Sequence, residues 1–210
     1  MGVAVAPVKF SPLPVAQEDV ARADMYALIA RLLYAPDGQL LRAIATTDEI
    51  VAETANAPLA EAWHALAAAA EACDTQVVKD EYEKLFIGVG RPEVMLFGSY
   101  YLAGFMMEKP LALLRDDLAQ MGLARNESVH EPEDHLSALC DVMRYLITGD
   151  ENRDAADLEQ QKQFFARHIQ TWYQRFCDAV LETKAANFYK HVARFIKVFF
   201  NIEVESFEML

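Results

Sequence analysis

The sequence predicts an all-α fold, in which a single compact helical domain consists of two helical halves joined by a hinge loop. Apolar residues recur at spacings of three and four along most of the chain, which is the pattern of amphipathic helices. No two-residue turn of the Asn-Gly type joins segments of alternating polarity, as a β-hairpin would require. With 53% hydrophobic and 24% charged residues, the chain has the composition of a folded globular domain.

The N-terminal part divides into a tail and three helices. Residues 1–16 contain three prolines and are expected to form a flexible tail, without the basic region and long apolar run of a signal peptide. The first helix is predicted over 19–34, because Ala-Pro-Asp-Gly follows it and stops the pattern. A short helix is expected over 39–45, and Pro58 suits the first turn of the third.

The remaining helices are predicted from caps, prolines and glycines. The stretch 87–99 contains three glycines and a proline and is expected to be irregular. Gly122 and Gly149 are expected to follow the ends of two helices. The predicted helix starts are Asp74, Pro110, Pro132 and Asp154, and a last helix carries an apolar stripe over 188–199.

One polar segment, 123–130, is the predicted hinge of the domain, which covers 17–210. It lies between Gly122 and Pro132 and lacks a periodic apolar stripe. The two halves would then be about 17–122 and 131–210.

The charge of the chain excludes several classes of partner. The net charge of −13 repels nucleic-acid phosphates and anionic lipid headgroups and attracts cationic partners. We therefore expect no nucleic-acid partner and no stable membrane association. The three cysteines form no CxxC pair, which favours buried apolar cysteines in a reducing cytoplasm over disulfides or a zinc site.

The stretch SVHEPEDHLSALC, residues 128–140, concentrates charge where a helix begins. Glu131, Glu133 and Asp134 could simply favour the positive end of the helix dipole. Together with His135 they could also hold an arginine guanidinium by paired hydrogen bonds. His130, Glu131, Asp134 and His135 are chemically able to bind a metal, but no spacing such as HExxH is present, and we expect no metal and no cofactor.

The stretch EYEKLFIGVGRPEVMLFGSYYL, residues 81–102, is an unusually apolar loop. Its side chains could pack on the core, or they could line a groove for an apolar peptide. Gly88 and Gly90 next to Arg91 could meet a phosphate, although no P-loop lysine follows. Ser99 and Ser137 have no GxSxG setting, and no nucleophile, base and oxyanion arrangement is found. The sequence does not indicate an enzyme.

Together the two stretches resemble motifs of the TorD/DmsD family of redox-enzyme maturation chaperones. The first motif reads Tyr82-Glu-Lys-Leu-Phe86-Ile-Gly-Val-Gly-Arg91-Pro92, followed by an aromatic loop with a serine and an aromatic pair. The second is E-P-x-D-H at 131–135. The chain departs from the family where Met95-Leu96-Phe97 replaces Pro-Pro-aromatic, at Val89, and at Ala103. These departures lie in the loop that would contact the client, so they bear on the identity of the client more than on the fold.

The resemblance implies a cytoplasmic, non-enzymatic chaperone. Its client would be the catalytic subunit of a molybdoenzyme, either of the DMSO-reductase type or a formate dehydrogenase. The chaperone would bind the N-terminal region of this subunit, often a twin-arginine signal peptide, until cofactor insertion is complete. A homodimer formed by exchange of the two halves is compatible with the family.

The resemblance also assigns residues to client binding. Glu131 and Asp134 would hold basic or N–H groups, with His135 orienting them. The expected site is Tyr82, Phe86, Arg91, Pro92, Met95, Leu96, Phe97, Tyr100, Tyr101, Glu131, Pro132, Asp134 and His135. Two alternatives stay open: a small nucleotide-binding or hydrolytic protein that uses the Gly88–Arg91 turn, and a purely structural assembly subunit.

Overall fold

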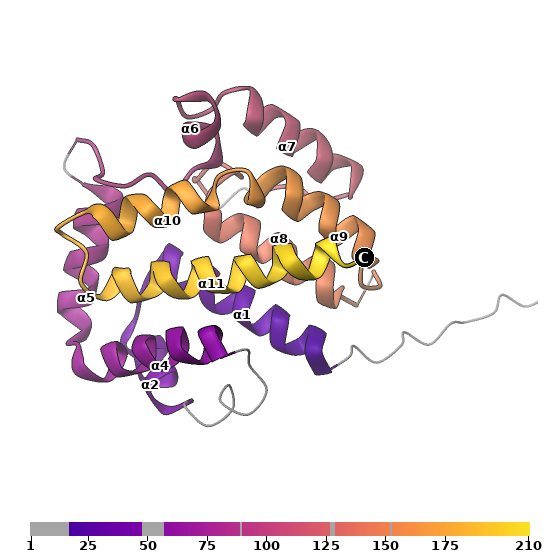
Figure 1. The fold of residues 1–210 in the computed structure, drawn as a ribbon. Helices are drawn as coiled ribbons and strands as arrows, with labels where there is room; N and C mark the ends of the chain where they lie inside the picture. The colour runs from indigo at the N-terminus through magenta and orange to yellow at the C-terminus, as the bar shows by residue number, and fades with distance from the viewer. Residues whose placement is uncertain (1–16, 48–56, 89, 127–128, 152) are drawn as a thin grey trace, which may run out of the picture.

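The computed structural model describes residues 17–47, 57–88, 90–126, 129–151 and 153–210 (Figure 1). These residues form an all-α structure, as predicted, and their only β-type pairings are isolated bridges at Phe97–His135 and Asp150–Arg153. The predicted tail, 1–16, lies outside the described residues. None of the described helices is both long and apolar enough to cross a membrane.

The helices follow the predicted order closely. Two π-helical turns, η1 (Glu83–Ile87) and η2 (Ala166–Gln170), continue α5 and α9. The short helix α6, which was not predicted, begins at the end of the stretch that was expected to be irregular. The bounds are α1 Gln17–Tyr34, α2 Gly38–Thr46, α4 Ala57–Ala72, α5 Thr75–Tyr82, α6 Gly98–Ala103, α7 Lys109–Gln120, α8 Leu136–Thr148, α9 Leu158–Phe165, α10 Tyr173–Glu182 and α11 Phe188–Glu208.

Two predicted helix starts were wrong. Helix α8 begins at Leu136, because the extended residue His135 caps it, and Pro132 lies in a turn closed by the hydrogen bond from His135 N–H to the Pro132 carbonyl. Helix α9 is capped by Asp157 instead of Asp154, because Asp157 and Gln160 form a reciprocal capping box. The predicted long helix after this cap is also interrupted, since η2 and the non-helical residue Trp172, with φ −145° and ψ −16°, separate α9 from α10.

Helices α1 and α11 organise the core. Helix α1 packs along α8, and α11 packs against α4 and α10 (Figure 1). Tyr26 of α1 is fully buried and contacts the rings of Phe199 and Phe200 of α11. Helix α1 precedes the segment 123–130 and helix α8 follows it, so the predicted halves pack against each other. The division of the domain into two halves with a hinge at 123–130 stays a prediction.

Two buried carboxylates connect distant helices. Glu203 of α11 accepts hydrogen bonds from Arg22 Nε and Nη2, each at 2.8 Å, and from the Tyr26 hydroxyl at 2.9 Å. Glu81 of α5 accepts backbone N–H groups of Asn187, Phe188 and Tyr189 at 2.8–3.1 Å. Glu81 thereby satisfies donors at the start of α11 that the helix itself leaves unpaired.

Candidate functional site

The two sequence motifs meet in space. The Leu136 N–H donates to the Leu96 carbonyl at 2.8 Å, and the Gly98 N–H donates to the Asp134 carbonyl at 3.0 Å. Between these bonds, the rings of Phe97 and His135 lie edge to face with centroids 5.1 Å apart. The aromatic loop and the E-P-x-D-H segment therefore form one structural unit, although 35 residues separate Ser99 from Asp134.

The side chain of Asp134 is buried between the aromatic loop and the E-P-x-D-H segment. Its side chain is 4% exposed, and Oδ2 accepts the Ser99 N–H at 2.7 Å. Its other oxygen, Oδ1, is buried and has no hydrogen-bond partner among the described residues. The carboxylate thus caps the start of α6, which is a structural role that exists without any client.

The apolar residues of the loop pack mainly on the core. Phe86 and Leu96 are buried, and Phe86 contacts the rings of Tyr82, Phe176 and Tyr189. The half-buried Tyr101 stacks on Trp172 with centroids 5.3 Å apart, and its hydroxyl donates to the Met95 carbonyl. The remaining predicted site residues of this loop, Met95, Phe97, Pro92 and Tyr100, are half-buried.

The glycine turn has a structural explanation. Gly88 has a φ of +63°, and a Cβ there would stand 2.6 Å from the Arg91 carbonyl oxygen. Only glycine fits such a left-handed residue so close to another backbone segment. Arg91 is exposed and donates to the Tyr100 hydroxyl at 3.2 Å, and residue 89 lies outside the described residues. Nothing in these contacts favours a phosphate site over a packed turn.

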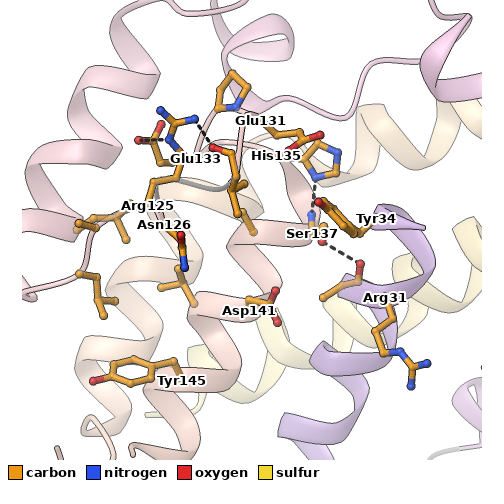
Figure 2. Close-up of a pocket in the computed structure, with 18 of the residues that line it drawn as sticks. Arg31, Tyr34, Arg125, Asn126, Glu131, Glu133, His135, Ser137, Asp141 and Tyr145 are labelled. Carbon is orange, nitrogen blue, oxygen red and sulfur yellow. Dashed lines mark hydrogen bonds and ion pairs between the residues drawn. The ribbon is translucent and has the colours of Figure 1, made fainter. Parts of the chain in front are cut away.

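A pocket of about 690 Å³ opens beside the E-P-x-D-H segment (Figure 2). Helices α1 and α8 form two of its walls, and the segment after α7 forms a third. We call it the α1–α8 groove. Its lining is mostly apolar, with carboxylates, arginines and tyrosines in addition: Ala30, Arg31, Tyr34, Ala35, Leu118, Leu123, Ala124, Arg125, Asn126, Val129, Glu131, Pro132, Glu133, His135, Ser137, Ala138, Asp141, Val142 and Tyr145.

The carboxylates of the groove differ in their pairing. Glu133 binds Arg115 at 2.9 Å and Arg125 at 3.5 Å. Burial alone would raise the pKa of Glu133, but the Arg115 hydrogen bond, a backbone hydrogen bond and the charges of Arg115 and Arg125 together outweigh burial, so the pKa lies below its usual value. Among the described residues, the only ion pair of Asp141 is a long, exposed one with Arg144 at 3.7 Å. Glu131 has no hydrogen-bond or ion-pair partner among the described residues. Glu131 and Asp141 are therefore the carboxylates left to receive a cation.

His135 lines the groove as a neutral side chain. Its Nδ1 accepts the Ser137 N–H at 3.2 Å, which places the ring proton on Nε2. Burial lowers the pKa of His135 to about 4, against a smaller opposite effect of Glu131. Near neutral pH the ring therefore offers an N–H donor and no charge. Ser137 itself donates from Oγ to the Ala30 carbonyl at 2.8 Å and so ties α8 to α1.

The groove contains only part of the predicted site. Of the predicted residues, Glu131, Pro132 and His135 line it, whereas Asp134 and the aromatic loop lie outside its lining. The sequence analysis missed the contribution of α1 and the face of α8 beyond His135. On α8 the signal was present, because Ala138, Val142 and Tyr145 recur at spacings of four and three. Among the described residues no group of His, Cys, Asp and Glu side chains could hold a metal ion.

Comparison with known proteins identifies the family. A family model described as nitrate reductase delta subunit matches residues 52–178, which is more than half of the chain. The chain belongs to this family. It is the family of the TorD/DmsD maturation chaperones, so the resemblance of the two motifs is confirmed.

Named members of the family resemble part of this TorD-family chain. A chaperone protein TorD of Vibrio cholerae is 27% identical over 121 residues, which are 55% of each chain. A Haemophilus influenzae protein described as a Tat proofreading chaperone DmsD is 29% identical over 120 residues, 56% of each chain. The matched part of this chain spans about half the length of the curated relatives. These relatives are named chaperones and not catalysts.

One solved structure shares the fold over nearly the whole chain. A crystal structure described as that of a redox enzyme maturation protein from Archaeoglobus fulgidus superposes with a TM-score of 0.60 at 18% identity. The superposition covers 93% of this chain and 98% of that one. At this identity the likeness establishes the TorD-type all-α fold and no more.

Proposed function

We propose that this TorD-family chain is a cytoplasmic chaperone that binds the N-terminal signal region of a molybdoenzyme catalytic subunit in the α1–α8 groove. It holds this region until the cofactor has been inserted. The enzyme is of the DMSO-reductase type or a formate dehydrogenase. Membership of the family and the named relatives support the class of function.

The observation that carries the proposal is the chemistry of the groove. Its lining is mostly apolar, and Glu131 has no hydrogen-bond or ion-pair partner among the described residues. A twin-arginine signal region combines guanidinium groups with an apolar stretch, so its two parts match the two parts of the groove. A guanidinium can form paired hydrogen bonds to a carboxylate, and the apolar stretch leaves water for the apolar lining.

We assign separate roles to the predicted residues and to Asp141, which was not among them. Glu131 contacts the cationic end of the client. Asp141, on α8, offers a second carboxylate in the lining of the groove. His135 donates a hydrogen bond from Nε2. Asp134 acts indirectly, because it fixes the loop that packs against His135. The aromatic loop supports the wall of the groove more than it touches the client.

The net charge of −13 assists this encounter. A basic segment is attracted over a distance comparable with the Debye length, about 8 Å at physiological salt. The association rate should therefore fall as salt is added, whereas contacts with the apolar lining should persist.

The proposal is tested by affinity purification of the tagged chain from its own cells, followed by identification of the bound proteins by mass spectrometry. We expect one immature molybdoenzyme catalytic subunit with the wild type and its loss with Glu131→Lys. The matched control is Glu61→Lys, which makes the same charge change at an exposed position on α4. If both variants retain the subunit, the groove does not hold it. If no molybdoenzyme subunit is recovered, the function is wrong.

A further inference from the structure

Glu133 of the α1–α8 groove already faces two guanidinium groups of the chain itself. Arg115 of α7 donates from Nε and Nη2 to Oε2 of Glu133, at 3.0 and 2.9 Å. Arg125, in the segment after α7, approaches Oε1 of Glu133 with Nε at 3.5 Å (Figure 2). The side chain of Glu133 is 13% exposed. The chain therefore occupies a largely buried carboxylate of the groove lining with its own arginines.

The two arginines are not held equally. The paired, short hydrogen bonds of Arg115 are the geometry of a strong guanidinium–carboxylate contact. The 3.5 Å separation of Arg125 from Glu133 exceeds the usual range for such bonds, about 2.7–3.2 Å. Arg125 also donates from Nη1 to the Val129 carbonyl at 2.6 Å, and its side chain is 37% exposed. Arg125 is therefore the more easily exchanged partner of Glu133.

An arginine from a ligand could take the place of Arg125 without a change in local charge. Both Arg125 and Glu133 line the groove, so the pair is accessible to a segment bound there. A guanidinium that replaces Arg125 leaves Glu133 with the same number of cationic partners, and no buried carboxylate loses its pairing. Arg115 stays in place, and the lowered pKa of Glu133 keeps the carboxylate ionised near neutral pH. A segment without a cation cannot make this exchange.

We propose that Arg125 is a built-in competitor for the client: its guanidinium holds Glu133 until a guanidinium of the client's signal region replaces it. This inference rests on the proposed function and adds a specificity-determining residue to it. Glu131 receives one cation directly, and Glu133 becomes a receptor for a second one when Arg125 leaves. A segment with two neighbouring arginines can fill both carboxylates, whereas a segment without them meets Glu133 already occupied.

The test measures the affinity of the full chain for two peptides by calorimetry. The first is a synthetic signal-region peptide, in which an Arg-Arg pair precedes an apolar stretch, and the second carries Gln-Gln in place of the pair. We expect Arg125→Gln to bind the Arg-Arg peptide about two- to fivefold more tightly than the wild type, which is the range of a weak, partly exposed ion pair. Its affinity for the Gln-Gln peptide should not change. The matched control is Arg42→Gln, the same charge change at an exposed position on α2, and it should bind both peptides like the wild type.

A second comparison separates exchange at Glu133 from a change in the local electrostatic field. In chains that carry Glu133→Gln, Arg125 has no carboxylate to compete for, so the further change Arg125→Gln should bring no gain in affinity. Arg125→Lys keeps a charge beside Glu133, so its gain should be smaller than that of Arg125→Gln. Circular dichroism checks that every variant melts like the wild type.

The remaining outcomes contradict the proposal. Unchanged or weaker binding of the Arg-Arg peptide by Arg125→Gln would show that Arg125 does not compete with it. A gain that persists together with Glu133→Gln, or that extends to the Gln-Gln peptide or to Arg42→Gln, would assign the effect to the general charge of the surface. In each of these cases the wild type still binds the Arg-Arg peptide, and the proposed function stands. If the wild type does not bind the Arg-Arg peptide, the proposed function and this inference fail together.

Discussion

The buried carboxylate of Asp134 lies 2.7 Å from the backbone nitrogen of Ser99 and accepts its hydrogen bond. This contact joins the two motifs that identify the family, and it places the acidic residue in the architecture of the loop. A side chain predicted to hold the client thus has a structural role in the chain itself. Its role in client binding stays a prediction, to be separated from its effect on folding.

Asp134→Ala should lower the free energy of unfolding by about 1–3 kcal/mol, because it leaves the buried Ser99 N–H without an acceptor. Asp134→Asn should cost less, since the amide oxygen can accept the same bond. Urea denaturation measures both values. Asp141→Ala, at an exposed position on α8, is the control and should be close to neutral. Equal stability of Asp134→Ala and the wild type would show that the contact contributes nothing.

Glu81→Ala should destabilise the chain by at least about 2 kcal/mol, because three backbone N–H groups at the start of α11 lose their acceptor. The neighbouring Glu83 is exposed, so Glu83→Ala serves as the control. Thermal unfolding followed by circular dichroism compares the two. Similar melting temperatures for both variants would contradict the role of Glu81 as a cap.

His135 should make stability depend on pH. Burial lowers its pKa from 6.5 to about 4 in the folded chain, so below pH 6.5 the unfolded chain binds the extra proton first. The contribution of the neutral His135 ring to the free energy of unfolding is fully present above pH 6.5. It is lost as the pH falls towards 4, and the loss is on the order of 3 kcal/mol. His135→Asn, which keeps a capping side chain, should remove this part of the pH dependence in urea titrations. An NMR titration of the ring that gives a pKa near 6.5 would refute it.

Gly88→Ala should be more destabilising than Gly90→Ala. Both glycines have positive φ values, so both substitutions carry backbone strain of about 1 kcal/mol or more. Only at Gly88 would the new Cβ also meet backbone atoms, at 2.6 Å from the Arg91 oxygen, whereas no atom lies within 4 Å at Gly90. Denaturation midpoints measure the difference, and equal values for the two variants would rule out the close approach.

The sequence predicted most helices because their apolar residues repeat with the helical period, as α1 and α11 illustrate. It misplaced the start of α8, because Pro132 is as compatible with a turn as with a first helical turn, and only the contacts of Asp134 and His135 decide between them. It missed α6 because that helix is stabilised by a carboxylate 35 residues away.

The groove was predictable only in part for a similar reason. The acidic residues at 131–135 were visible as a local cluster, but local sequence does not reveal which of them are already paired. Glu133 is held by arginines from α7 and from the following segment, and Asp134 by the distant Ser99. The opposite wall comes from α1, which reaches α8 through the bond of Ser137 to Ala30, 107 residues away.

The most direct test of the groove is the affinity of the synthetic signal-region peptide for the wild type and for Ala138→Phe, measured by calorimetry. Ala138 lies on the α8 wall, so a phenyl ring there fills the groove without altering any carboxylate. We expect the variant to fold normally and to bind the peptide at least about tenfold more weakly. Unchanged affinity in a folded variant would mean that the signal region binds elsewhere, and the proposed function of the groove would be wrong.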